Sequence, residues 1–193
     1  MGRARRITRL TGARFHRLRG LASCAVALTV MCSAAHAGHS TQEPETEQAG
    51  NVLFVRPPGW QRHNQPDGTV LLVPPDVSAR QVALAINPGR ERQDKDLRHW
   101  FNVSWGALLQ ANGAKVLSGG DVRGGRRRGV EALSTSAVLQ SATGARTYTA
   151  FFVSAPGTRV EAVLFVASSD TLYAKYLEPV LDFMAAVRFA NLP

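Results

Sequence analysis

The stretch RTYTAFFVSAPGTRVEAVLFVA, residues Arg146–Ala167, decides the fold. It holds two alternating segments, Arg146–Ser154 and Thr158–Ala167, joined by Ala155-Pro156-Gly157, and this order predicts a β-hairpin. Each segment is apolar on both faces; the second divides into Val160, Ala162, Leu164 and Val166 on one side and Val163, Phe165 and Ala167 on the other. A strand that is apolar on both faces is covered on both faces. The sequence therefore predicts two central strands with helices above and below them.

Shorter strand patterns surround this hairpin. They are apolar or alternating runs that end at Pro, Gly or Asn-Gly signals, where a strand or helix stops. The strands expected from them are Val52–Arg56, Val70–Val73, Gln81–Asn87, Lys115–Leu117 and Val130–Leu139.

Two segments have the spacing of an amphipathic helix. The first stops at Asn112-Gly113, and its apolar positions are Leu97, Phe101, Ser104 or Trp105, and Leu108. The final helix carries Val180, Leu181, Met184 and Val187, and Pro179 fits best in its first turn, where a missing N–H costs no hydrogen bond. The predicted fold is therefore α+β, an α-β-α sandwich with a mainly antiparallel sheet of about six or seven strands flanked by helices.

Residues 1–37 have the composition of an export signal. The segment Met1–Arg19 carries seven arginines and no acidic residue, and the apolar run from Leu21 to about Ala35 ends in Ala35-His36-Ala37. Basic, apolar and small residues in this order are typical of a secretory signal peptide. We expect cleavage near Ala37 and a mature protein that is periplasmic or secreted.

Three other interpretations of this segment stay open. An uncleaved anchor is disfavoured because about 15 apolar residues are fewer than the roughly 20 that span a bilayer. Lipidation at Cys24 would require the apolar run to precede the cysteine, whereas most of it follows. Arg5-Arg6 resembles a twin-arginine export signal, although Thr8 and Arg9 stand where that signal favours apolar residues.

Charge is distributed unevenly along the chain. The 193 residues include 23 basic and 14 acidic side chains, a net charge of +9. Loss of residues 1–37 removes seven arginines and both cysteines, which leaves a net charge of about +2 and no thiol chemistry. Residues 38–51 are predicted to be a flexible polar leader, and residues 52–193 a single domain with a net charge of about +5. An exported domain rarely meets nucleic acid, so we expect no nucleic-acid partner.

No catalytic spacing is visible in the sequence. Beyond the signal segment, His39, His63 and His99 lie outside any metal-binding motif, and the chain has neither a G-x-S-x-G elbow nor a P-loop. Asp94 and Asp96 form an acidic pair of the kind that marks a solvated helix start. We therefore expect no catalytic residue, no metal and no cofactor, and hence a protein that is not an enzyme.

The strongest local feature is DVRGGRRRG, residues Asp121–Gly129. Its arginines, Arg123, Arg126, Arg127 and Arg128, supply more than half of the net charge of the predicted domain. Guanidinium groups suit phosphate or carboxylate, and glycines let backbone N–H groups approach an anion. These arginines are candidate contacts to an anionic envelope component or an acidic protein; the alternative is a flexible, solvated hairpin.

Trp60 and Trp105 are candidate pocket aromatics. An apolar ligand held between the sheet and a helix would lie near one of them. The alternative is packing in the core, which is the commoner role of a tryptophan at such positions.

Both ends of the predicted domain resemble a known superfamily. The opening FVRPPGW, Phe54–Trp60, is similar to the opening of PsbP/Mog1/DcrB-like proteins, and Tyr173–Met184 followed by Val187–Phe189 is similar to their closing helix and last residues. The resemblance spans about residues 52–190, and members include photosystem accessory subunits, a Ran-GTPase binder, secretion chaperones and exported bacterial proteins. It implies a non-enzymatic accessory or binding module. Together with the predicted signal segment and the lack of catalytic spacing, it leads us to expect an exported accessory or binding protein that acts on a protein or envelope partner. A carrier of a small apolar ligand and a hydrolase without a recognised motif are the alternatives.

Overall fold

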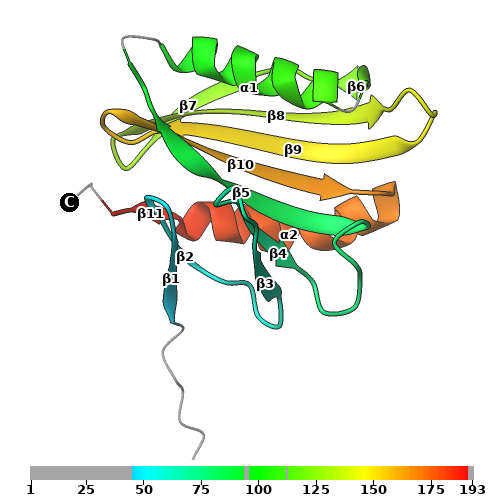
Figure 1. Cartoon of the computed structure of the whole chain (residues 1–193), viewed down its shortest axis with the longest axis horizontal. Helices are drawn as coiled ribbons and strands as arrows, with labels where there is room; N and C mark the ends of the chain where they lie inside the picture. Colours follow the sequence, from blue (N-terminus) through cyan, green and yellow to red (C-terminus); the bar gives the residue numbers. More distant parts are fainter. Residues whose placement is uncertain (1–44, 94–95, 112, 191–193) are drawn as a thin grey trace, which may run out of the picture. The chain divides into compact units, whose positions relative to one another are not determined.

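Strands β9 (Arg146–Ala155) and β10 (Arg159–Ala167) lie at the centre of the main sheet, as the sequence predicts. They pair antiparallel, from Glu161 opposite Ser154 to Ala167 opposite Tyr148. The computed structural model describes residues 45–93, 96–111 and 113–190. Its main sheet has eight strands in the order β3-β4-β5-β10-β9-β8-β6, with β7 also paired to β8 (Figure 1).

The remaining strands fill both sides of this central pair. In the main sheet they are β3 (Gln61–Asn64), β4 (Val70–Val73), β5 (Val82–Glu91), β6 (Lys115–Gly119), β7 (Arg123–Arg127) and β8 (Val130–Gln140). A separate three-stranded sheet of order β1-β2-β11 consists of β1 (Thr46–Ala49), β2 (Val52–Val55) and β11 (Arg188–Phe189). The main sheet exceeds the predicted size because β3 and β7 are polar strands. Backbone pairing to β4 and β8 holds them, and no hydrophobic period reveals such strands.

Two helices cover opposite faces of the main sheet (Figure 1). Helix α1 (Leu97–Ala111) buries Leu97 and Phe101 against Phe151 and Val153 of β9. Helix α2 (Asp170–Ala186) packs on the other face, where its buried residues are Tyr176, Val180 and Phe183 and those of β10 are Val163 and Phe165. The prediction of an α+β sandwich with a mainly antiparallel sheet is confirmed.

Helix α2 begins earlier than predicted. The Ser169 side chain accepts a hydrogen bond from the backbone N–H of Leu172 at 3.2 Å, which caps the helix at its N-terminus. Pro179 therefore lies inside the helix and not in its first turn. A proline inside a helix has no backbone N–H and so removes one hydrogen bond. The buried side chains of Val180 and Phe183, which follow Pro179 in α2, stabilise the helix despite this missing bond.

The flexible leader predicted for residues 38–51 ends earlier than expected. Strand β1 lies within it and pairs antiparallel with β2 from Thr46 opposite Val55. Glu47 forms ion pairs with Arg56 and Arg62, both at 2.9 Å. An acidic residue that suggested a flexible leader therefore forms ion pairs with arginines of the domain. The predicted signal segment lies outside the described residues. In the described part of the chain, no helix combines the length and the apolar character that crossing a bilayer requires.

Candidate functional site

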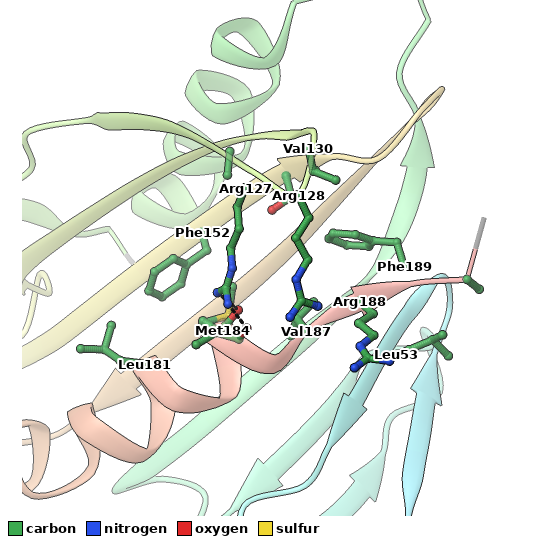
Figure 2. A pocket seen from close by; sticks show the side chains of 14 residues that line it. Leu53, Arg127, Arg128, Val130, Phe152, Leu181, Met184, Val187, Arg188 and Phe189 are labelled. Carbon is green, nitrogen blue, oxygen red and sulfur yellow. Dashed lines mark hydrogen bonds between the residues drawn. The ribbon is translucent and has the colours of Figure 1, made fainter. Parts of the chain in front are cut away.

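A groove of about 720 Å³ lies between the C-terminal half of α2, β11 and the end of the β7–β8 hairpin (Figure 2). We call it the α2 groove. Its volume falls in the range of small-molecule sites, and its lining is mainly apolar. Among the residues that the structure describes, three arginines and no carboxylate line it. The lining residues with most bearing on its chemistry are Arg127, Arg128, Phe152, Leu181, Met184 and Arg188.

The helical side of the groove is a second apolar stripe on α2. Tyr176, Val180 and Phe183 form the buried stripe that faces the sheet. Leu181 and Met184, three residues apart, lie beside that stripe and line the groove, and Leu181 is 49% exposed. Leu181, directly after the buried Val180, makes the apolar face of the helix wider than packing against the sheet requires. This extra width is the feature of the sequence that could have predicted the groove.

The sheet side of the groove follows from strand alternation. Val130 and Ala132 on β8 and Phe152 and Ser154 on β9 line it, and Ala132 lies directly opposite Ser154. Residues two apart in a strand share a face, so all four lie on the α2 side of the sheet. Val153, between two of them, packs on the α1 side.

Arg128 occupies a strained position at the tip of the β7–β8 hairpin. Arg127 pairs with Val130, so Arg128 and Gly129 form a two-residue turn in which φ is 46° and 80°. Such a turn favours Asn, Asp or Gly, and a side chain with a Cβ in this left-handed conformation costs about 1–2 kcal/mol. The Arg128 side chain extends from the tip toward the junction of α2 and β11 (Figure 2). It makes no hydrogen bond or ion pair with any residue that the structure describes.

Arg127 joins the hairpin to the end of α2. Its guanidinium group donates hydrogen bonds to the backbone oxygen of Met184 at 3.1 Å and to that of Ala185. These carbonyls belong to the last turn of α2, where a cation is favourable. Arg188 lines the same groove from β11 and, within the described part of the chain, has no hydrogen-bond or ion-pair partner.

The structure divides the four arginines singled out in the sequence. Arg127 and Arg128 line the α2 groove, whereas Arg123 and Arg126 lie on β7 outside it. Arg126 donates from Nε to the backbone oxygen of Gly129 at 3.2 Å, across its own turn. Only the half of the cluster next to the turn therefore faces apolar surface.

The two candidate pocket aromatics lie on opposite faces of the sheet. Trp60 is buried on the α2 side, where its ring meets Tyr176 edge-on with centroids 5.8 Å apart. Trp105 packs on the α1 side with Phe101 and Phe151, at centroid distances of 6.5 and 5.9 Å. Neither lines the α2 groove, so the structure places both in aromatic clusters of the two cores.

A smaller hollow of about 400 Å³ lies against α1. Trp100 and Phe151 form part of its wall, and Asp67 and Arg90 bring charges of both signs to its lining. This hollow therefore has no preference for one sign of charge, and the α2 groove is the stronger candidate site.

The buried acid Glu161 lies one strand from the groove, opposite Ser154. Its side chain is 1% exposed, and its Oε1 accepts a hydrogen bond from Arg159 Nε at 3.2 Å. Burial raises the pKa of Glu161, and the hydrogen bond and charge of Arg159 oppose this shift. Its Oε2 has no hydrogen-bond partner among the described residues. Glu161 thus pairs with Arg159 beneath the surface and is not one of the residues that line the groove.

A polar cluster anchors the loop after β4 to α2. Asp76 accepts hydrogen bonds from Lys175 Nζ at 2.6 Å and from the Tyr176 hydroxyl. These donors, Lys175 first, lower the pKa of Asp76 to about 2. The contacts hold the helix at its middle and leave the Leu181 side free for the groove.

The histidines of the described chain are not near the groove. His63 lies on β3 and His99 on α1, and both are exposed. His39 lies outside the described residues. Across residues 45–93, 96–111 and 113–190, no group of three or more His, Cys, Asp or Glu side chains could hold a metal ion.

Similarity to other proteins appears in the fold and not in the sequence. No known family profile matches the chain, and no curated protein matches it. The solution structure of cyanobacterial PsbP (CyanoP) from Synechocystis sp. PCC 6803 is similar with a TM-score of 0.56 at 10% identity, over 75% of this chain and 90% of that one. The Ran-binding protein Mog1p from Saccharomyces cerevisiae is similar with a TM-score of 0.49 at 11% identity, over 76% of this chain and 96% of that one. Likeness at such identities concerns architecture and leaves activity open. The chain therefore has a fold similar to that of PsbP, as the motifs at both ends of its domain predict.

Proposed function

We propose that this chain is an exported, non-enzymatic accessory or binding protein whose partner occupies the α2 groove. The observation that carries the proposal is an open apolar surface next to arginines, with no carboxylate among the described residues of the lining. Apolar surface that a monomer leaves open is typical of a binding site. The partner is a protein or an anionic component of the cell envelope.

The chemistry of the lining supports binding over catalysis. The part of the groove that the structure describes contains no His, Cys, Asp or Glu side chain, so these lining residues offer neither a carboxylate or imidazole base nor a thiol nucleophile. Among the described lining residues, Ser154 is the one that bears a hydroxyl group, and none of the others is a base. The groups that remain are apolar side chains and guanidinium ions, which recognise a partner without transforming it.

Export is proposed from the sequence of residues 1–37. Fractionation of the native host followed by mass spectrometry of the purified protein tests it. We expect a mature N-terminus at Gly38 in the envelope or the medium. A chain that retains Met1 and stays in the cytosol would contradict export.

Site-specific photo-crosslinking tests the groove itself. We would replace Leu181, 49% exposed in the groove, with p-benzoylphenylalanine, and replace Val103, 46% exposed on α1, as the matched control. Irradiation in the native host should give a specific adduct at Leu181 and none at Val103. No adduct at either position, or the same adducts at both, would refute the assignment of the groove as the binding site.

A further inference from the structure

We propose that the α2 groove binds a single-chain anionic amphiphile, of which a fatty carboxylate is the simplest example. The head group contacts Arg128, and the hydrocarbon chain lies against Phe152 and Leu181. This inference rests on the proposed function, because it names the chemistry of the partner that the groove holds.

Charge complementarity determines the head group. Arg127 already donates to two carbonyls of α2, whereas Arg128 has no hydrogen-bond or ion-pair partner in the described chain, and Arg188 adds a third positive charge to the lining. A guanidinium ion presents a planar set of donors that matches a carboxylate. Arg128 is exposed, and none of the described residues that line the groove is acidic, so its guanidinium group is available to pair with an anion.

The conformation of Arg128 is a second and independent observation. A turn with positive φ at both central residues accepts Asn or Gly without strain, yet this chain places arginine there. Strain at a residue whose side chain reaches into a groove points to a role for that side chain. The guanidinium group accordingly ends beside the α2–β11 junction, at the exposed edge of the groove (Figure 2).

Apolar surface determines the rest of the ligand. Figure 2 shows Phe152 and Leu181 on one side of the arginine pair and Phe189 on the other. Met184 and Val187 extend the apolar lining between them. A short anion such as acetate would leave this surface wet, whereas a hydrocarbon chain would cover it.

Calorimetric titration of the protein purified in the form that its host produces tests the proposal. The probes are dodecanoate, dodecyltrimethylammonium and acetate, each below its micelle concentration. We expect dodecanoate to bind at least about tenfold more tightly than dodecyltrimethylammonium, and acetate to show no binding. Equal binding of the anionic and cationic chains, or binding of acetate alone, would overturn the proposal.

Substitutions at the turn separate a binding role from a structural one. R128N should weaken dodecanoate binding about tenfold and at the same time raise the melting temperature, because Asn tolerates the left-handed conformation. R128K should keep most of the binding, and R123N, which removes the same charge from β7 outside the groove, should leave it unchanged. Unchanged binding in R128N would refute the role of Arg128.

Two further outcomes identify a different occupant. A dimer that forms with concentration and dissociates in L181D would show that a second copy covers the groove, and would overturn the amphiphile. A specific protein adduct at Leu181 without dodecanoate binding would do the same while leaving the proposed function intact. Loss of both the adduct and dodecanoate binding would refute the two together.

Discussion

Gly89 is the position where a single methyl group should be most informative about this fold. Gly89 lies on β5 where the pairing with β10 shifts register, between Val160 opposite Arg90 and Ala162 opposite Asn87. The buried Glu161 carboxyl group fills the space above it. A Cβ at Gly89 would lie 2.1 Å from Glu161 Oε1 and 2.2 Å from Oε2, well inside contact distance.

The Glu161 carboxyl group has little room to move away. Its side chain is 1% exposed, and Arg159 ties it in place by donating from Nε to its Oε1 and from Nη2 to the backbone oxygen of Gly89 at 2.7 Å. G89A should therefore act as an overpacking substitution and lower the free energy of unfolding by about 1–3 kcal/mol. G125A on β7, where a Cβ meets nothing within 4 Å, is the control and should change it by less than about 0.5 kcal/mol.

A double-mutant cycle identifies the cause. In an E161A background the space above Gly89 is vacant, so the added methyl group should cost little, and the coupling energy should be about 1–2 kcal/mol. Urea unfolding of the four variants measures it, with unchanged m-values as the check on two-state behaviour. Additive effects, or a G89A variant as stable as the parent, would refute the reasoning that the carboxylate is held against this glycine.

Three further changes follow from the electrostatics and the α2 terminus. Burial raises the pKa of Glu161 above its ordinary value of 4.5. The contribution of Glu161 to the free energy of unfolding is therefore greatest below pH 4.5 and is lost as the pH rises through the folded-state pKa. When unfolding free energies are measured across a pH series, E161Q should remove this pH dependence. The pKa of Asp76 is lowered from its ordinary value of 3.8 to about 2, so Asp76 stabilises the fold above pH 3.8 and loses this effect as the pH falls toward 2. D76N should therefore lower the free energy of unfolding at neutral pH, and the difference in stability between D76N and the parent should become smaller in acid. The substitution also removes the carboxylate that accepts hydrogen bonds from Lys175 and Tyr176. R127M frees two carbonyls of α2 and should cost about 1 kcal/mol, with faster amide exchange confined to the last turn; unchanged exchange there would contradict the hydrogen bonds.

Local periodicity explains which elements could be predicted. The alternating apolar faces of Arg146–Ser154 and Thr158–Ala167 identified the two central strands, and the helical spacing of Leu97 and Phe101 identified α1. Both signals depend on residues a few positions apart, whose geometry the backbone sets. Strands β3 and β7 carry no such signal, because their pairing partners and not their own side chains hold them in the sheet.

Competing local rules explain the errors. Pro179 suggested the start of a helix, but Ser169 caps α2 a full ten residues earlier, and burial of the helix outweighs one missing hydrogen bond. The acidic residues of the predicted leader suggested a solvent-exposed, flexible segment. Glu47 instead forms ion pairs with Arg56 and Arg62 and lies in strand β1, which pairs with β2. In both cases a tertiary contact overrode a propensity.

What the sequence by itself determined was the sandwich and the presence of a basic cluster, since composition and period are properties of neighbouring residues. Only the tertiary structure decided which arginines line the α2 groove. Arg127 and the end of α2 are joined by hydrogen bonds across more than fifty residues of sequence. The turn at Arg128 and Gly129 aims one side chain at apolar surface that Leu181 leaves open. No period in the sequence encodes that meeting, because it depends on the order of the strands and on where α2 ends above them.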